Sequence, residues 1–400
     1  MREVVFVDGA RSIFGRQGGG LKQLCCSDIA SLVMKGLLER NKTHMAAEDV
    51  DAVVCGSAQG DIKAFNPARY AALGAGLPVQ TECHYMEMQC GSAITSINHA
   101  AAQIALGYAD VILAGGMESH STSAVYFDTT IPPYRQIGPR PLVMHLAPTP
   151  EQDISMLQVS DQMAAKWKIS REQCDEFALR SQSRLQTAYR TGITGAEIIP
   201  YTQPASRKEP EKKADRDEHP RPEATMEGLR SLSPVLEGGV TTAGNASGKN
   251  DGAAFVLLMS AEKARELGYV PYARWVTGAD VGVEPRYMGI GPVFSSLKAL
   301  KAAGLTLDDL DVFECNEAFA AQNLCVISEL EHQTGKRIDP SIWNPNGGAI
   351  AIGHPNGASG ARIAWFAVKQ LERTGGKYGL FSACCGGGHG TTAIIENLRR

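Results

Sequence analysis

The amino-acid sequence predicts an α/β protein of two similar halves joined by an inserted segment, and three observations support this prediction. Strand-like and helix-like segments alternate through the first part of the chain, the same order returns near the C-terminus, and the composition shifts between them. Alternation of this kind is typical of a mostly parallel sheet with helices on its faces. We therefore expect an N-terminal half over residues 1–118, a loop domain over 119–250 and a C-terminal half over 251–400.

The N-terminal half begins with an apolar run at residues 4–7, followed by a glycine, which indicates a first strand. Further strands are expected at residues 52–54 and 111–114. Helices are expected at residues 27–40 and 66–74, and a long helix begins at Cys90. The strand expected at residues 111–114 runs into two glycines, Gly115 and Gly116.

The C-terminal half repeats this order. Residues 47–55 resemble residues 307–315, because in each an acidic turn leads into a strand. A helix start rich in glycine and serine then precedes a strand that runs into glycines, once within residues 90–116 and again within 357–388. The period is far too long for a solenoid, so we interpret the repeat as an internal duplication. Two packed halves would place their corresponding loops near one another.

The inserted segment is rich in loops and charge. Residues 131–150 are rich in proline, and residues 207–223 carry six basic and six acidic residues with three prolines. Two helices are expected, over residues 153–167 and 170–190, and the second begins with a capping box, Ser170-Arg-Glu-Gln. Such a segment is typical of a solvated, lid-like insertion.

Length and composition describe an ordinary soluble protein. The chain has 400 residues, 44% hydrophobic and 20% charged, with a formal net charge of −4 that gives no reason to expect a nucleic-acid partner. No stretch approaches the roughly 20 apolar residues that span a bilayer. Ten cysteines without a secretory signal favour a reducing cytoplasm, in which they are free thiols, ligands or nucleophiles.

One glycine-rich stretch, residues 344–362, holds His354 between a glycine and a proline. Proline disfavours the α conformation for the residue before it, and glycine permits tight turns, so we expect a rigid loop that presents the imidazole. Ser359 and Gly360 then open a helix. A histidine that merely lies in a turn is the alternative interpretation.

Two cysteines lie where a thiol could react. Cys90 begins a helix, whose dipole is expected to lower the pKa of the thiol and favour the thiolate. Cys384 ends a strand that runs into glycines whose N–H groups could bind an oxyanion. Small buried hydrophobic residues are the alternative for both. We expect no metal, because Cys-x-x-Cys is absent and adjacent pairs such as Cys384-Cys385 chelate poorly.

Asn316 follows the duplicated strand and opens a helix. Its side chain could cap the helix, orient a water or polarise a carbonyl.

Residues 242–252 resemble a phosphate-binding loop, but they have three residues rather than four before Gly-Lys, and asparagine follows the lysine, which excludes nucleotide hydrolysis. No Gly-x-Gly-x-x-Gly follows a strand, which argues against a dinucleotide. We therefore expect no cofactor.

Taken together, five motifs resemble the thiolase family in order and spacing, and the resemblance covers essentially the whole chain. They are Cys90-Gly91-Ser92, residues 244–248, residues 316–320, residues 346–348 with 353–360, and Cys384 with its glycines at 386–388. The resemblance implies a five-layered αβαβα fold of two related halves with a loop domain. It also implies an obligate homodimer or homotetramer.

The reaction that the resemblance implies is reversible thiolysis of a 3-ketoacyl-CoA by CoA, or the reverse Claisen condensation. Cys90 would be the acylated nucleophile and His354 the base that activates it. Cys384 would be the acid or base at the acetyl α-carbon. Asn316 would hold a water that, with His354, binds the thioester oxygen, and the backbone N–H groups of Cys90 and Gly386 would form a second oxyanion site. Carbon–carbon cleavage needs an acyl acceptor and a proton donor, so two thiols are reasonable.

CoA contacts are implied at five further positions: Ser247, Met288, Phe319, Met156 and Arg221. The apolar residues among them would line the pantetheine tunnel, and Arg221 could face CoA phosphates. A solvated face is the alternative for the charged run around Arg221.

Four departures from the family pattern are Glu87, Ser155, Lys249 and His389. We expect Glu87 to affect support of the loop before Cys90 and the other three to affect the acyl-chain preference.

We predict from these motifs an acyl-CoA acyltransferase of lipid metabolism, including fatty acid β-oxidation, whose partners are CoA thioesters and further copies of the chain. The substrate would be acetoacetyl-CoA or a somewhat longer 3-ketoacyl-CoA. One alternative is a ketoacyl synthase-like condensing enzyme, which would not need Cys384. Another is a non-catalytic acyl-CoA-binding protein on the same fold.

Overall fold

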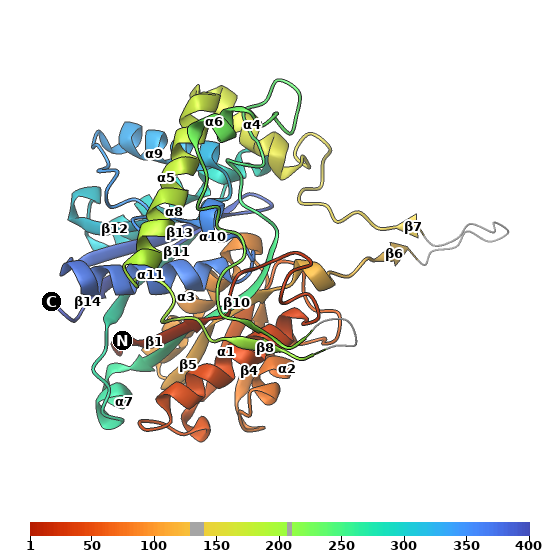
Figure 1. The fold of residues 1–400 in the computed structure, drawn as a ribbon. Helices are drawn as coiled ribbons and strands as arrows, with labels where there is room; N and C mark the ends of the chain where they lie inside the picture. Colours follow the sequence, from red (N-terminus) through yellow and green to blue (C-terminus); the bar gives the residue numbers. More distant parts are fainter. Residues whose placement is uncertain (129–139, 206–209) are drawn as a thin grey trace.

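The computed structural model describes residues 1–128, 140–205 and 210–400 (Figure 1). Parts of the proline-rich and charged stretches, residues 131–139 and 207–209, therefore lie outside the described residues. All the helices and strands predicted for the N-terminal half are present. Its elements are β1 (Val4–Arg11), β2 (Gly15–Arg16), α1 (Cys26–Asn41), η1 (Ala47–Asp49), β3 (Ala52–Gly56), α2 (Pro67–Gly74), β4 (Glu82–Met86), η2 (Gln89–Gly91), α3 (Ser92–Leu106) and β5 (Val111–Glu118).

The inserted segment is mainly helical in its second part. Its elements are η3 (His120–Thr122), β6 (Phe127–Asp128), β7 (Arg140–Pro141), α4 (Met156–Trp167), α5 (Arg171–Arg190), β8 (Tyr201–Gln203), β9 (Lys212–Ala214) and α6 (Met226–Arg230). The predicted capping box at Ser170 is confirmed, because its hydroxyl accepts from the Gln173 N–H. Figure 1 shows β6 and β7 on an arm that projects from the body of the molecule.

The remainder of the chain carries the second set of alternating elements. They are β10 (Asn250–Ser260), α7 (Ala261–Glu266), β11 (Ala273–Gly282), η4 (Pro285–Ile290), α8 (Gly291–Ala303), η5 (Leu307–Asp309), β12 (Leu310–Cys315), α9 (Ala320–Thr334), α10 (Ala349–Ile352), α11 (Ser359–Thr374), β13 (Tyr378–Cys385) and β14 (His389–Asn397). The predicted duplication is visible, because η1 leads into β3 as η5 leads into β12, and both strands have a parallel neighbour.

The strands form a mixed sheet in the order β12-β13-β14-β11-β1-β10-β5-β3-β4, with β2 beside β10. Only β3–β4, β3–β5 and β12–β13 are parallel among the described pairs, so the expectation of a mostly parallel sheet is wrong. The prediction failed because it did not foresee the strands that pair antiparallel. Strands β13 and β14 are joined by a short glycine turn, which requires antiparallel pairing, and β10 runs antiparallel to both β1 and β5.

The two halves of the sheet meet where β1 pairs briefly with β11, at Val5–Arg274 and Phe6–Ala273. Strand β10 lies between β1 and β5, although it follows the inserted segment in sequence. Strand β10, which the sequence analysis placed in the C-terminal half, therefore pairs with N-terminal strands on both sides.

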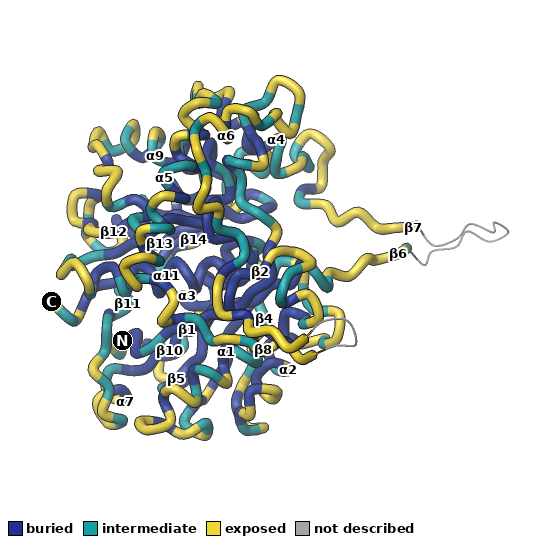
Figure 2. The backbone as a smooth tube through the Cα atoms, in the orientation of Figure 1, coloured by how far each residue is buried: buried dark blue, intermediate teal, exposed yellow. Residues whose placement is uncertain are grey.

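Three large apolar cores lie between the layers, and the middle one packs α3 and α11 against strands of both halves, which confirms the αβαβα architecture of five layers. Successive residues of a strand point to opposite faces, so Val53 and Val54 of β3 enter different cores. Helices α1 and α2 cover one face of the N-terminal strands, α3 and α11 fill the middle layer, and α8 and α9 cover the far face of the C-terminal strands. Figure 2 shows buried residues through this stack and exposed residues at its rim.

Helices α4 and α5 of the inserted segment extend the outer core of the C-terminal half. Val159 and Phe177 share that core with Val326 of α9. The segment therefore covers the side of the molecule on which β12 and β13 end. In the described parts of the chain, no helix combines the length and apolar character needed to cross a bilayer.

Candidate active site

The four predicted catalytic side chains come from elements that converge between the two halves. Cys90 lies in η2, directly before the middle-layer helix α3, and His354 lies in the loop between α10 and α11. Asn316 follows β12, and Cys384 is the penultimate residue of β13. Because β12 and β13 are parallel neighbours, their carboxyl ends meet at one edge of the sheet, where α/β proteins place their ligands.

The turn that presents Cys90 is held in an unusual conformation. Gln89 has a φ of 47°, in the left-handed region, and the carboxylate of Glu87 accepts hydrogen bonds from the Gln89 backbone N–H and side-chain amide, both at 2.7 Å. Glu87 thus supports the loop before Cys90, as the sequence suggested. Gly91 must be a glycine, since a Cβ there would lie 2.4 Å from the Cys385 sulfur.

Cys90 is buried, and its protonation differs from the prediction. Burial raises the pKa of Cys90 to about 11, which outweighs the lowering by a hydrogen bond from Asn356, while Glu118 and Glu87 raise it further. The helix dipole was expected to lower this pKa, and that expectation is wrong because desolvation of the thiolate is the larger effect. The free site therefore holds Cys90 as a thiol at neutral pH.

The loop fixes His354 on three sides. Its backbone N–H donates to Asn250 Oδ1 at 3.0 Å, and its Nδ1 lies 2.6 Å from the Ser359 hydroxyl. That hydroxyl donates to the Pro355 carbonyl at 3.1 Å, so it accepts from Nδ1–H. Nε2 is then the unprotonated nitrogen, and it faces the Asn316 amide nitrogen at 3.4 Å. The predicted loop and the helix that Ser359 opens are both confirmed.

His354 is neutral in this site. Burial is the main cause that lowers the pKa of His354 to about 3, and nearby His120 and Arg362 lower it further. A neutral imidazole with an unprotonated Nε2 is the form that can accept a proton.

Asn316 is buried and does not cap the helix, because Phe319 occupies the N-cap position of α9. Its backbone N–H donates to the Ser382 carbonyl of β13 at 2.9 Å, which fixes it over the sheet. The Asn316 amide faces His354 instead of capping α9, so it is available to form a hydrogen bond with a ligand.

Cys384 is fully buried. Burial first, and then the neighbouring thiols Cys90 and Cys385, raise the pKa of Cys384 well above its usual value. Cys384 is therefore a thiol that can donate a proton. Gly386 begins the turn to β14, and Gly388 must be a glycine, because its φ is 92° and a Cβ would lie 2.3 Å from the Val283 carbonyl oxygen.

Sequence reasoning missed the residue that touches the Cys90 sulfur. The Asn356 amide nitrogen donates to Cys90 Sγ at 3.3 Å, and among the described residues it provides the hydrogen-bonded link between the His354 loop and Cys90. Its amide oxygen lies 2.9 Å from His120 Nε2. The only available signal was a polar residue inside the glycine-rich motif, two positions after His354.

The predicted CoA contacts divide into two groups. Met288, Phe319 and Met156 border the outer core of the C-terminal half, and Ser247 lies beside Phe319, since its N–H donates to the Ala318 carbonyl at 3.0 Å. Arg221 is exposed on the inserted segment. The structure thus brings the first four residues to one region and leaves Arg221 at the surface.

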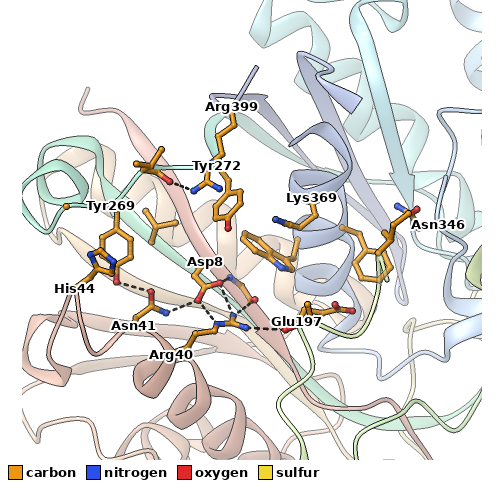
Figure 3. Close-up of a pocket in the computed structure, with 18 residues that line it drawn as sticks. Asp8, Arg40, Asn41, His44, Glu197, Tyr269, Tyr272, Asn346, Lys369 and Arg399 are labelled. Atoms are coloured by element: carbon orange, nitrogen blue, oxygen red, sulfur yellow. Dashed lines mark hydrogen bonds and ion pairs between the residues drawn. The ribbon is translucent and has the colours of Figure 1, made fainter. Parts of the chain in front are cut away.

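No group of three or more His, Cys, Asp and Glu side chains suited to a metal occurs in the portion of the chain that the structure describes. A cavity of about 550 Å³ lies away from the site (Figure 3). None of the predicted site residues lines it, and Arg40 in its wall forms an ion pair with Asp8 at 2.8 Å. This cavity is therefore separate from the cluster of Cys90, His354, Asn316 and Cys384.

Replacing Ser359 with alanine is expected to lower kcat about tenfold, because the buried Nδ1–H of His354 loses the acceptor that fixes its tautomer and ring orientation. KM should change little. Ser96→Ala is the matched control, since the Ser96 hydroxyl on α3 is buried without a hydrogen-bond partner among the described residues. Steady-state kinetics on both variants test this, and an unchanged kcat in Ser359→Ala would show that the hydroxyl does not position the base.

Comparison with known proteins supports one family. The family description "Thiolase, N-terminal domain" matches residues 4–262, and "Thiolase, C-terminal domain" matches residues 269–397, so the division between them falls after β10. The chain is 42% identical to a 3-oxoadipyl-CoA/3-oxo-5,6-dehydrosuberyl-CoA thiolase of Escherichia coli, over 100% of both chains. It is 41% identical to an acetyl-CoA acetyltransferase of Chromobacterium violaceum, over 98% of this chain and 99% of that protein.

Solved structures support the same family. The acetyl-CoA acetyltransferase of Bacillus anthracis superposes with a TM-score of 0.92 at 37% identity, covering 100% of this chain and 99% of the other. Human mitochondrial 3-ketoacyl-CoA thiolase superposes with a TM-score of 0.91 at 37% identity, covering 99% of each chain. These matches span both halves and the inserted segment, and the chain therefore belongs to the thiolase family.

Proposed function

We propose that this protein cleaves acetoacetyl-CoA or a somewhat longer 3-ketoacyl-CoA with CoA, and catalyses the reverse condensation, through an acyl-Cys90 intermediate. As a thiolase the chain is an acyltransferase. The observation that carries the finer proposal is the burial together of two thiols, Cys90 and Cys384, with the imidazole of His354 and the amide of Asn316.

In the proposed cleavage, the Cys90 sulfur attacks the 3-keto carbon of the substrate as its proton passes to His354. The bond between C2 and C3 then breaks, and its electron pair forms the enolate of acetyl-CoA. Cys384 protonates that enolate at C2, and acetyl-CoA leaves. CoA next gives its thiol proton to the Cys384 thiolate and attacks the acyl-Cys90 thioester. The shortened acyl-CoA is released, and the Cys90 thiolate takes back its proton from His354.

The protonation states support these roles. Cys90 and His354 are both neutral before substrate binds, because the pKa of the thiol is raised to about 11 and that of the imidazole is lowered to about 3. The proton would therefore move only as the carbon–sulfur bond forms. Cys384 keeps its proton until a carbanion develops, as a general acid must.

Two groups of donors would stabilise developing negative charge. The Asn316 amide and His354 lie together, so a water held there could bind the thioester oxygen of the enolate. The backbone N–H groups of Cys90 and Gly386, in a turn and a glycine loop, would bind the other oxyanion. Ser247, Met288, Phe319, Met156 and Arg221 are proposed to contact CoA.

An oligomer in the cytoplasm is the second part of the proposal. The arm that carries β6 and β7 exposes apolar side chains, including Val125, Phe127, Val143 and Met144, which a homodimer or homotetramer could cover. All ten cysteines are free thiols, as suits a reducing compartment. Thiolysis is the direction that fatty acid β-oxidation would use.

Chromatography of the products tests the reaction. The wild-type protein with acetoacetyl-CoA and CoA is expected to give two acetyl-CoA for each acetoacetyl-CoA consumed. A parallel reaction with a 3-oxoadipyl-CoA and a 3-oxohexanoyl-CoA would rank the acyl groups. Binding of all three without any acetyl-CoA would contradict the proposed function and favour a binding protein.

A further inference from the structure

A chain of three polar side chains, which we name the polar relay, leads from the surface of the N-terminal half to Cys90. It consists of Gln59, His120 and Asn356. The Gln59 amide nitrogen lies 3.4 Å from His120 Nδ1, His120 Nε2 lies 2.9 Å from Asn356 Oδ1, and the Asn356 amide nitrogen lies 3.3 Å from Cys90 Sγ. The proposed cleavage mechanism uses none of the three.

The hydrogen bonds of the relay run in one direction. Ser123 donates its hydroxyl proton to the Gln59 amide oxygen, so the Gln59 NH₂ group faces His120. His120 Nδ1 is then an acceptor, and its Nε2 carries the proton that Asn356 Oδ1 accepts. This fixes the Asn356 amide with its NH₂ group toward Cys90. The Asn356 NH₂ group, which is the last donor of the relay, therefore donates to Cys90 Sγ.

The backbone around the relay is held by one carboxylate. Glu118 of β5 accepts from the N–H groups of Ala58 at 2.9 Å and Gly357 at 3.0 Å, which are the neighbours of Gln59 and Asn356. Gly357 also lies directly on β5, since a Cβ on Gly116 would be 2.0 Å from its carbonyl oxygen. These contacts with β5 therefore fix the backbone next to Gln59 and Asn356 relative to the sheet.

We propose that His120 and Asn356 are positioning residues for the nucleophile, in which His120 orients the Asn356 amide so that it donates to the Cys90 sulfur and stabilises the thiolate over the thiol. A donor of this kind is worth most to a charged acceptor in a buried site. Cys90 is such a case, because burial opposes its ionisation, and the Asn356 side chain favours ionisation by donating a hydrogen bond to the sulfur. The inference rests on the proposed function, which makes Cys90 the nucleophile.

Other titratable groups also face the relay and Cys90, and the relay substitutions leave these residues unchanged in the sequence. They are Glu118 of β5, Asp251 of β10, Glu87 before η2, His354, and the thiols Cys384 and Cys385 of β13. Glu118 and Glu87 disfavour the Cys90 thiolate by repulsion, and the hydrogen bond from Asn356 opposes this effect.

The test is the pH profile of Cys90 alkylation by iodoacetamide, quantified on the Cys90 peptide by mass spectrometry. Asn356→Leu, which keeps the branched shape of the side chain but removes the donor, is expected to slow alkylation about tenfold at pH 8 and to move the midpoint of the profile to higher pH. His120→Phe should act in the same direction with a smaller effect, and His120→Gln, which retains an N–H donor, should restore most of the rate. His332→Phe, on the exposed surface of α9, is the matched control.

Steady-state kinetics provide a second readout. Both Asn356→Leu and His120→Phe should lower kcat and leave KM for the acyl-CoA within about twofold, because the relay acts on the sulfur rather than on substrate binding. Circular dichroism checks folding. If Asn356→Leu does not fold, His120→Phe and Gln59→Leu decide the question by the same profile.

The outcomes separate the two claims. An alkylation profile that is the same in wild type, Asn356→Leu and His120→Phe would overturn the relay while leaving acyl transfer intact. A shifted profile in a protein whose wild type forms no acyl adduct from any 3-ketoacyl-CoA would support the relay and overturn the proposed function.

Discussion

Cys384→Ala is expected to lower cleavage of acetoacetyl-CoA by roughly 10²–10⁴-fold, which is the range that a positioned general acid supplies. The acetyl-CoA enolate would then have no proton donor when the carbon–carbon bond breaks. Acylation of Cys90 by acetyl-CoA itself breaks only a carbon–sulfur bond, so it should persist in this variant. Steady-state cleavage rates and the mass of the acetylated protein measure the two steps separately.

Cys325→Ala is the matched control for this loss. Cys325 of α9 is a buried free thiol in the same outer core as Cys384, so its removal leaves a similar cavity without touching the site. Both variants should lose comparable thermal stability, and Cys325→Ala should keep its cleavage rate. If Cys384→Ala cleaved acetoacetyl-CoA as fast as the control, a condensing enzyme of ketoacyl synthase type would be the better description.

Removal of the base should have an effect of similar size. His354→Ala is expected to lower kcat for thiolysis by roughly 10²–10⁴-fold, because the Cys90 thiol would have no acceptor for its proton. The pKa of His354 is lowered to about 3, so the neutral base is present above that pH and is lost only as the pH falls through it. The rate of the wild type between pH 5 and 8 should therefore show no acidic limb from His354.

His332→Ala, exposed on α9, serves as the control for the histidine substitution. A wild-type profile that falls below pH 6.5, and that loses this limb in His354→Ala, would mean that the imidazole titrates near its ordinary value and is far less desolvated than the structure indicates.

Much of the site could be predicted because its residues lie in local motifs. The loop that holds His354 follows from Gly353 and Pro355, and the helix after it follows from Ser359 and Gly360. The duplication was visible because η1 with β3 and η5 with β12 share an acidic turn and an apolar run. Local chemistry of this kind depends only on neighbours in the sequence.

What escaped prediction depends on contacts between distant parts of the chain. His120 and Asn356 are 236 residues apart, and neither residue type signals the other. The position of β10 between β1 and β5 likewise depends on the path of the chain after the inserted segment. The pKa of Cys90 was misjudged because the helix start was visible in the sequence, whereas the burial that outweighs it was not.

The most direct test of the account is the intact mass of the wild type and Cys90→Ser after incubation with acetoacetyl-CoA and, separately, with a longer 3-ketoacyl-CoA. We expect an acyl adduct on the wild type alone, with a mass that equals the acyl group left after loss of acetyl-CoA. An adduct of the same mass on folded Cys90→Ser, or no adduct on the wild type with either substrate, would contradict Cys90 as the nucleophile.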